Sequence, residues 1–247
     1  MSRIVLKNIS IEFPIYNASS RSLKKNFIRM ATGGMVTKDS NQRVMVEALN
    51  DISISFNHGD RVGIIGHNGA GKSTLLKLLA GIYEQTKGDL LVQGKVTPLF
   101  ELLVGVESEY TGYENIFLRG TLLGLSKEEI NSQIDEIAEF TGLGDYLFMP
   151  TRTYSNGMMV RLAFAISVSV NPEILLIDEI FGAGDSDFMV KAQQKMVGLL
   201  DKSNIVIMAN HSESLIKEFC NKCLLLEAGQ VKYYGEVDEA LRMYHSL

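Results

Sequence analysis

Continuous runs of hydrophobic residues mark the buried strands expected along the chain. Residues 61–65 (RVGII), 174–177 (ILLI) and 205–208 (IVIM) are short and almost entirely apolar. A central strand of a parallel sheet is buried on both faces, so it reads as a continuous apolar run instead of an alternation. The first run predicts a buried strand, residues 174–177 a central parallel strand, and residues 205–208 a further strand.

Helical spacing predicts the elements between these strands. Leucines within residues 75–79 indicate a helix soon after the first strand. Ser126 and Glu129, three residues apart, form a predicted capping box ahead of an apolar helical stripe. Ser155 is the predicted N-cap of a further helix. A hairpin turn at residues 228–229 and a terminal helix complete the pattern.

Composition limits the class of protein. The 247 residues allow one large domain, or one domain with a smaller helical subdomain. The net charge of −5 argues against nucleic acid as a partner. No signal peptide and no long apolar run is apparent, so we expect a cytosolic chain that reaches a membrane only by docking. Cys220 and Cys223 form a lone CxxC, which we interpret as two ordinary reduced thiols.

A glycine-rich loop between a strand and a helix carries the first chemical signal. Residues 66–73 (GHNGAGKS) match the phosphate-loop pattern GxxxxGK[ST]. Glycines let backbone N–H groups surround an anion, and the following helix adds its partial positive charge. Lys72 is expected to reach the β- and γ-phosphates, and Ser73 to ligate Mg²⁺. The predicted ATP-binding residues of this loop are Gly66, His67, Asn68, Gly69, Ala70, Gly71, Lys72, Ser73 and Thr74.

Two carboxylates follow the strand at residues 174–177. Asp178, at the end where α/β sheets present ligands, is expected to hold Mg²⁺ through water. Glu179 is expected to act as a general base on the water that attacks the γ-phosphate. The alternative, two solvated acids at a strand end, is disfavoured by the phosphate loop upstream. GTP is disfavoured because a DxxG after the loop and an NKxD sequence are both missing.

Taken in order, these motifs resemble the nucleotide-binding subunits of ABC transporters. Residues 154–158 (YSNGM) occupy the place of that family's LSGGQ-like signature, and His211 that of its switch histidine. Alone, a histidine after a strand is more often structural. The resemblance implies an α/β fold. It comprises a P-loop NTPase core of the ABC ATPase type, a helical subdomain with the signature, and a small N-terminal antiparallel β region.

The resemblance also implies domains, partners and roles. Residues 1–98 and 160–247 would form the ATP-binding core, and residues 99–159 the helical subdomain that reaches a membrane permease. Two copies would sandwich ATP, with Ser155 and Gly157 binding the γ-phosphate in trans. Lys72, Glu179 and His211 would be catalytic. Glu101 and Asp185 fall at the coupling and intersubunit loops.

Two aromatic residues are candidates for the contact with adenine. The family stacks adenine on an aromatic after its first strand, and Tyr16 is the first choice here, with Phe13 as the alternative. Surface or core roles for both rings are about as probable, because stacking tolerates many sequences.

Several departures from the general family pattern resemble one branch, the ATPases that export bacterial cell-surface polysaccharides. The departures are Tyr154, Asn156 and Met158 in the signature, Ile180 after the acid pair, and Glu101 where most members have glutamine. Leu102 departs from that branch as well. The expected cargo is a lipid-linked polysaccharide, O-antigen first, moved through a separate permease at the cytoplasmic face of the inner membrane. Alternatives are a drug or lipid cargo, or a soluble ABC ATPase of translation or DNA maintenance.

Overall fold

The computed structural model of the protein describes residues 1–15, 35–38, 44–100, 102–178 and 186–247. Two compact units make up the chain. The first comprises residues 1–96, 174–179 and 204–247, and the second comprises residues 97–173 and 180–203. The predictions for Tyr16, Glu101, Glu179 and Asp185 lie outside the described residues.

A largely parallel sheet forms the centre of the first unit. Its strands are ordered β10-β9-β4-β8-β7, and β6 (Val96–Leu99) follows where the chain passes into the second unit. The bounds are β4 Arg61–Ile65, β7 Ile174–Asp178, β8 Ile205–Ala209, β9 Lys222–Glu227 and β10 Gln230–Gly235. The three strands predicted from apolar runs are therefore confirmed, and all of β8 is buried.

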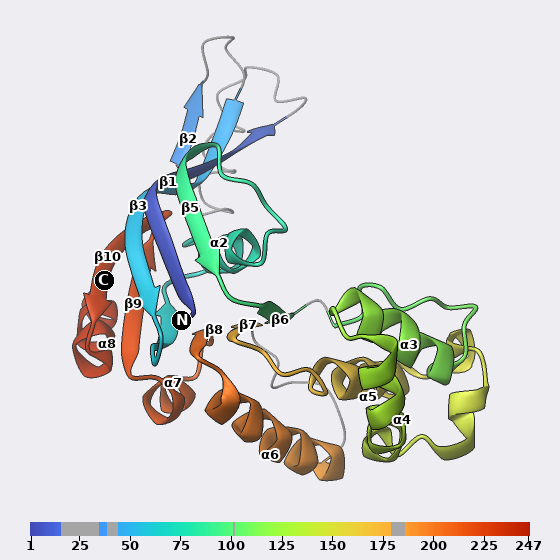
Figure 1. Ribbon diagram of the computed structural model, residues 1–247. Helices are drawn as coiled ribbons and strands as arrows, with labels where there is room; N and C mark the ends of the chain where they lie inside the picture. Colours follow the sequence, from blue (N-terminus) through green and yellow to red (C-terminus); the bar gives the residue numbers. More distant parts are fainter. Residues whose placement is uncertain (16–34, 39–43, 101, 179–185) are drawn as a thin grey trace. The chain divides into compact units, whose positions relative to one another are not determined.

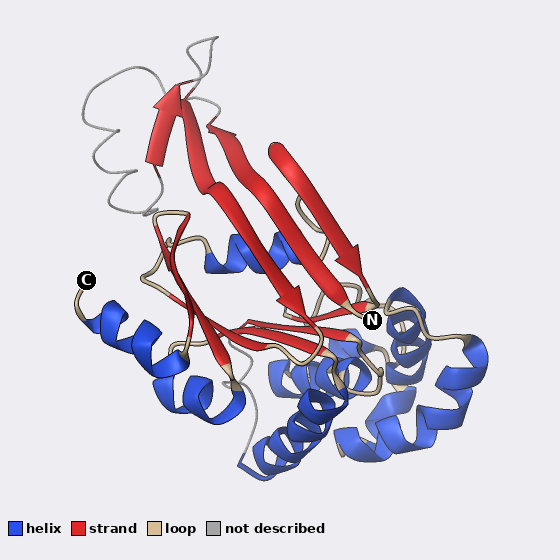
Figure 2. Cartoon of the chain, turned by 60° about the vertical axis from the view of Figure 1, so that its left-hand side comes forward, coloured by secondary structure: helices blue, strands red, loops and turns tan. Residues whose placement is uncertain are grey.

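An antiparallel sheet forms a second layer of the same unit (Figure 2). It contains β1 (Arg3–Ile15), β2 (Met35–Lys38), β3 (Val44–Asn57) and β5 (Lys87–Gln93), in the order β2-β3-β1-β5. Helix α2 (Lys72–Leu79) packs against β3 of this sheet and against β7 and β8 of the parallel sheet. Its four leucines are all buried, as a helix between two sheets requires.

Two more helices complete the first unit. The hairpin of β9 and β10 turns at Ala228 and Gly229, as predicted, and both residues have positive φ. Helix α7 (Glu213–Phe219) precedes β9, and α8 (Val237–His245) follows β10 (Figure 1).

Helices dominate the second unit. They are α3 (Gly112–Leu122), α4 (Lys127–Thr141), α5 (Asn156–Ser167) and α6 (Ser186–Lys202), with the 3-10 turns η1 (Gly144–Phe148) and η2 (Thr151–Thr153). Both Thr111 at α3 and Ser126 at α4 form complete capping boxes, which confirms the predicted one. Within the described ranges, no helix is long and apolar enough to cross a membrane.

A buried asparagine organises the loop that leads into α3. Asn115 is fully buried, and its amide accepts from the Glu107 N–H at 2.7 Å and donates to the Glu107 carbonyl at 2.9 Å. The same amide donates to the carbonyls of Tyr110 and Thr111. These bonds satisfy backbone groups that no regular element would pair.

The compact units divide the chain at different residues from the predicted domains. Helix α5 and the turn after it share one apolar core with α3 and α4, through Leu162, Ile166 and Val170. Phe188 of α6 packs against the rings of Phe140 and Phe164. Packing therefore groups residues 160–173 and α6 with the helical unit. The functional division into an ATP-binding core and a helical subdomain stays a prediction.

The two cysteines are free thiols, which agrees with their predicted role. Cys223 lies in β9 and is fully buried, and Cys220 is partly buried. Burial raises the pKa of each thiol to about 12, helped at Cys220 by repulsion from Cys223 and opposed by Arg61. Both groups are therefore protonated at neutral pH.

We expect both cysteines to resist alkylation in the native protein. A thiol pKa raised from an ordinary value to about 12 lowers the thiolate fraction at pH 8 roughly 1000-fold. Iodoacetamide labelling at pH 8, followed by mass spectrometry, should be slow and should accelerate as the pH rises toward 10. Urea-denatured protein is the control, and equal rates in native and denatured samples would contradict the prediction.

Candidate nucleotide-binding site

Parallel pairing aligns the ends of three strands that carry the predicted site residues. Ala209 of β8 pairs in register with Ile64 of β4 on one side and with Asp178 of β7 on the other. The carboxyl ends of these strands therefore lie at one level of the sheet. The phosphate loop follows β4, and His211 follows β8. The structure thus brings the loop, His211 and Asp178 to one edge, as α/β sheets do with ligand sites.

The phosphate loop begins with a turn that only glycine can make. Gly66 has φ of +148°, and a Cβ there would lie 2.2 Å from the carbonyl oxygen of Leu226. The Ala70 N–H then donates to the His67 carbonyl at 3.0 Å, which closes the loop before α2. Its amides are thus gathered at the N-terminus of α2, a ready anion site.

Lys72 is held back against the same loop. It is only 8% exposed, and its Nζ donates to the Gly66 carbonyl at 2.7 Å and to the His67 carbonyl at 3.3 Å. These two carbonyls hold the ammonium group at the base of the loop. A phosphate is a stronger, charge-assisted acceptor for this group.

A cavity of about 320 Å³ opens over the loop. Residues of the loop and of three other segments line it: Phe13, Val46, Ala48, Asn68, Gly69, Ala70, Gly71, Lys72, Ser73, Thr74 and His211. Seven predicted ATP-binding residues and His211 are thus brought together. The other two loop residues, Gly66 and His67, support Lys72 from beneath.

Phe13, the alternative adenine partner, lines this cavity. Its side chain is 36% exposed, and its ring makes an edge contact with Tyr83 at 5.2 Å between centroids. An exposed aromatic beside a phosphate loop is suited to stack on a base. Among the described residues, Phe13 therefore fits the predicted adenine contact.

Two supports of the loop were not predicted. The Gly229 N–H donates to the Ala70 carbonyl at 3.0 Å, and the Gly229 carbonyl accepts from Asn50 at 2.9 Å. The β9–β10 turn therefore ties the loop to β3. Tyr244 of α8 packs on the ring of His67, with 5.1 Å between centroids. No spacing in the sequence signals contacts between segments so far apart.

Two oxygen donors at this edge suit Mg²⁺. Ser73 lines the cavity with its hydroxyl at the start of α2, and Asp178 ends β7 at the level of β4. Hydroxyl, carboxylate, water and phosphate oxygens are the ligands that Mg²⁺ prefers. The residues present therefore fit the predicted metal.

The predicted signature residues line a cavity of their own in the second unit. The Ser155 hydroxyl caps α5 by accepting from the Met158 N–H at 3.3 Å, which confirms the predicted N-cap. Ser155, Gly157 and Arg161 line a cavity of about 640 Å³ together with Gly142, Leu143, Tyr146 and Met158. The helix N-terminus and the Arg161 guanidinium both favour an anion there.

Tyr154, which departs from the usual signature, has a structural explanation. Its hydroxyl donates to the Tyr146 carbonyl at 2.6 Å, and burial raises its pKa. The phenol thereby fixes η1 beside the start of α5. This bond keeps Tyr146 at the edge of the signature cavity.

Gly157 is not required by packing within the chain. A Cβ added to it would meet only the Ser155 hydroxyl oxygen, at an ordinary 3.9 Å. Packing within the chain therefore does not explain a glycine on the rim of the signature cavity.

Comparison with known proteins agrees with this geometry. Residues 49–182, more than half of the chain, match the family model described as ABC transporter. The O-antigen export system ATP-binding protein RfbE of Yersinia enterocolitica is 48% identical over 231 residues, covering 94% of this chain and 97% of that protein.

Two further relatives are longer. The O-antigen export system ATP-binding protein RfbB of Myxococcus xanthus is 35% identical to this chain. The alignment covers 99% of this chain and 56% of RfbB. The teichoic acids export ATP-binding protein TagH of Bacillus anthracis is 38% identical to this chain. The alignment covers 98% of this chain and 42% of TagH.

Solved structures show the same fold. An ATP-binding subunit of an ABC transporter aligns with a TM-score of 0.71 at 22% identity, covering 98% of this chain and 93% of its own. A dimeric ATP-binding cassette in a post-hydrolysis state with ADP and Pi aligns with a TM-score of 0.67 at 20% identity. The alignment covers 95% of this chain and 98% of that cassette. The predicted fold class is therefore confirmed.

We expect Phe13→Ala to weaken ATP binding roughly 5- to 150-fold, because base stacking on an aromatic contributes about 1–3 kcal/mol. Titration calorimetry with ATP in the Glu179→Gln background measures this loss without turnover. Phe148→Ala, a phenylalanine 68% exposed in the other unit, is the matched control. If Tyr16→Ala causes the loss and Phe13→Ala does not, Tyr16 is the adenine partner.

Proposed function

Because the chain belongs to the ABC transporter family, we propose that it is the ATPase subunit of an exporter of lipid-linked cell-surface polysaccharide, with O-antigen as the first candidate. The proposed cargo rests on the 48% identity to an O-antigen export ATP-binding protein, of which the chain spans 97%. Teichoic acid export relatives at 38% identity support the wider class of cell-surface polymers.

ATP binding begins at the phosphate loop. The loop amides bind the phosphate oxygens, and Lys72 exchanges its two carbonyl acceptors for the β- and γ-phosphates. Phe13 or Tyr16 stacks on adenine. Since Lys72 is already buried and oriented, little reorganisation is needed when the nucleotide arrives.

Mg²⁺ would be held by the Ser73 hydroxyl and, through water, by Asp178. When bound, it neutralises charge on the phosphate oxygens. Ser73 also belongs to the first turn of α2, so its hydroxyl is placed by the helix and not by a mobile loop.

Hydrolysis requires a base and an orienting group beside the γ-phosphate. Glu179 follows Asp178 directly in the sequence, and in this proposal its carboxylate accepts a proton from the attacking water. His211, on the rim of the nucleotide cavity, orients the γ-phosphate and that water. Asp178, the residue before Glu179, ends β7 at the edge of the sheet where His211 follows β8.

The ATP sandwich needs a second copy of the chain. Ser155 and Gly157 of one copy bind the γ-phosphate held by the other, through the N-terminus of α5 and the open space at Gly157. Asp185 belongs to the loop that signals between copies, and Glu101 to the loop that couples to the permease. Dimeric solved cassettes of the same fold support this arrangement.

The transport path belongs to a separate membrane permease in this proposal. The ATPase works at the cytoplasmic face of the inner membrane and holds to it through the permease. Closing and reopening of the dimer would move the helical elements of each copy against that partner, with no nucleic acid involved.

Glu179→Gln should bind ATP and form a stable dimer but lose turnover at least about 100-fold, because the base is removed without changing its size. Phosphate release measures turnover, and light scattering with and without ATP measures the dimer. Turnover near the wild-type rate would remove Glu179 from its assigned role.

Adding Gly157→Asp to that variant should abolish the ATP-dependent dimer and leave ATP binding by the monomer intact, because the new carboxylate repels the γ-phosphate of the other copy. Leu122→Asp, at a position of α3 that is 66% exposed, is the control for the added charge. A dimer that survives Gly157→Asp would place the trans contact elsewhere.

The cargo is tested by purifying tagged Glu179→Gln protein with ATP from detergent-solubilised membranes of its native host. We expect a multi-span permease and a prenyl-linked glycan, both identified by mass spectrometry. A permease that carries a drug or phospholipid would replace the polysaccharide. Ribosomes or DNA-associated proteins without a membrane partner would overturn the exporter.

A further inference from the structure

Helix α8 touches the phosphate loop through one contact between two rings. The ring of Tyr244 lies 5.1 Å from the ring of His67, centroid to centroid, at a tilt of 43°. His67 is an exposed residue of the loop, and Tyr244 is partly buried. The side chain of His67 therefore rests on a helix from the far end of the sequence.

His67 also holds the inside of the loop, through its backbone. Its carbonyl accepts from the Ala70 N–H at 3.0 Å and from Lys72 Nζ at 3.3 Å. The first bond closes the loop, and the second orients the ammonium group that meets the phosphates. A contact that fixes the side chain of His67 therefore also helps to fix the acceptor of both bonds.

Helix α8 has other attachments to the first unit. It packs against β9 and β10, and its residues Ala240 and Leu241 are buried. The Tyr233 hydroxyl of β10 donates to the Glu239 carboxylate of α8 at 2.8 Å. Since these contacts hold the helix on the sheet, we expect α8 to keep its place when the ring of Tyr244 is removed.

The residue after Tyr244 connects α8 to the start of α7. His245 Nε2 lies 3.0 Å from Glu213 Oε1, which is hydrogen-bond distance. A second pair joins Lys217 Nζ to Asp238 Oδ1 at 2.8 Å, nearer the other end of both helices. The two helices therefore run antiparallel, with the start of α7 beside the end of α8.

The start of α7 follows directly on His211. Glu213 is the first residue of the helix, and Ser212 is its N-cap. The Ser212 N–H donates to the side-chain oxygen of Asn210 at 2.7 Å, so the residues on either side of His211 are bonded to each other. A displacement of the start of α7 would therefore displace His211, which lines the nucleotide cavity.

We propose that α8 is a positioning element of the ATPase site. Tyr244 holds the phosphate loop in the shape that binds ATP, and His245 holds the start of α7, which places His211 beside the γ-phosphate. Two adjacent residues of one helix thereby link nucleotide binding to hydrolysis. The role of His245 rests on the proposed function, which assigns His211, whereas the role of Tyr244 requires only that the loop binds ATP.

Tyr244→Ala tests the support of the phosphate loop. We expect it to weaken ATP binding roughly 2- to 10-fold, the effect of losing one aromatic contact, and to raise the KM for ATP similarly while kcat changes little. Titration calorimetry in the Glu179→Gln background measures the affinity, and phosphate release measures KM and kcat. Tyr244→Phe keeps the ring and should restore the affinity. Binding of ATP by Tyr244→Ala at wild-type strength would overturn the role of Tyr244.

The two rings should act as one unit. If Tyr244 acts through His67, then Tyr244→Ala added to His67→Ala should weaken ATP binding no further than His67→Ala does alone. Losses that add in full would show that Tyr244 acts by another route, and would overturn the ring contact as the cause.

His245→Leu tests the contact with α7. We expect kcat to fall at least about threefold with ATP affinity unchanged, because a small displacement of a group beside the reacting atoms slows the reaction. His245→Lys keeps a donor for Glu213 and should restore most of kcat. Asp238→Ala removes the other pair between the same helices and should leave kcat unchanged. An equal fall with Asp238→Ala would show that the helices merely stabilise each other, and would overturn the role of His245.

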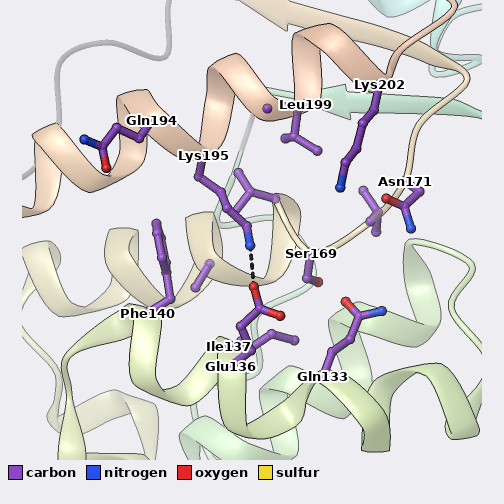
Figure 3. A pocket seen from close by; sticks show the side chains of 14 residues that line it. Gln133, Glu136, Ile137, Phe140, Ser169, Asn171, Gln194, Lys195, Leu199 and Lys202 are labelled. Atoms are coloured by element: carbon purple, nitrogen blue, oxygen red, sulfur yellow. Dashed lines mark hydrogen bonds and ion pairs between the residues drawn. The ribbon is translucent and has the colours of Figure 1, made fainter.

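An ion pair in the second unit is the control for changes of surface charge. Glu136 of α4 pairs with Lys195 of α6 (Figure 3), and the Glu136 side chain is 68% exposed, close to the 61% of His245. Glu136→Gln should leave ATP affinity, KM and kcat at their wild-type values. A comparable fall of kcat in this variant would mean that the effect of His245→Leu is not specific to α7, and would overturn it.

His211→Ala separates this inference from the proposed function. If His211→Ala hydrolyses ATP at the wild-type rate, the assignment of His211 and the role of His245 are both overturned, and the role of Tyr244 stands. If His211→Ala loses turnover while His245→Leu keeps it, the proposed function stands and the role of His245 alone is overturned. We expect both variants to lose turnover, His211→Ala by the larger factor.

Discussion

The common register of β4, β8 and β7 is the constraint on which the nucleotide site depends. Backbone pairing fixes Ile64, Ala209 and Asp178 side by side, so the segments that follow all leave the sheet at the same edge. A shift of one strand by one residue would turn its side chains to the opposite face. Because these strands are buried on both faces, such a shift would also expose apolar surface. The packing of the core therefore stabilises the register that positions the site.

The phosphate loop in turn depends on segments that carry no recognisable chemistry. The β9–β10 turn bonds to it through Gly229, and α8 touches it through Tyr244. Gly66 can approach the Leu226 carbonyl only because it lacks a side chain. The conformation that gathers the amides is therefore enforced by strand pairing and hairpin geometry. A nucleotide meets a loop that is largely preorganised, which lowers the entropic cost of binding.

The sequence predicts those parts of the protein whose cause is local. Apolar runs give the three central strands, and the hydroxyls of Ser126 and Ser155 give two helix starts, because caps act within four residues. The phosphate loop is predicted for the same reason. Asn115 and the unit boundary are not, since burial of a polar side chain depends on contacts distant in sequence. Helix α5 shows this: its N-cap is predicted, whereas its packing with α3 and α4 is not.

The burial of a charged side chain was not predicted from the sequence either. Arg119, in the middle of α3, is 6% exposed, and desolvation lowers its pKa to about 10. Its guanidinium donates to the Ser167 hydroxyl at 3.0 Å, an arrangement that a helical pattern of hydrophobic residues does not suggest. A buried cation with a neutral partner destabilises the fold by itself.

The glycines differ in whether the fold has room for a side chain at their positions. Gly66 is required by the fold, since a side chain there would collide with backbone. Gly157 and Gly198 are not, because an added Cβ at either meets no close neighbour within the chain. Both line cavities, and Gly198 lies in the interior of α6, where glycine lowers helix stability. Packing within the chain therefore does not explain glycine at these two positions. By the proposal above, the open space at Gly157 receives the nucleotide held by a second copy of the chain.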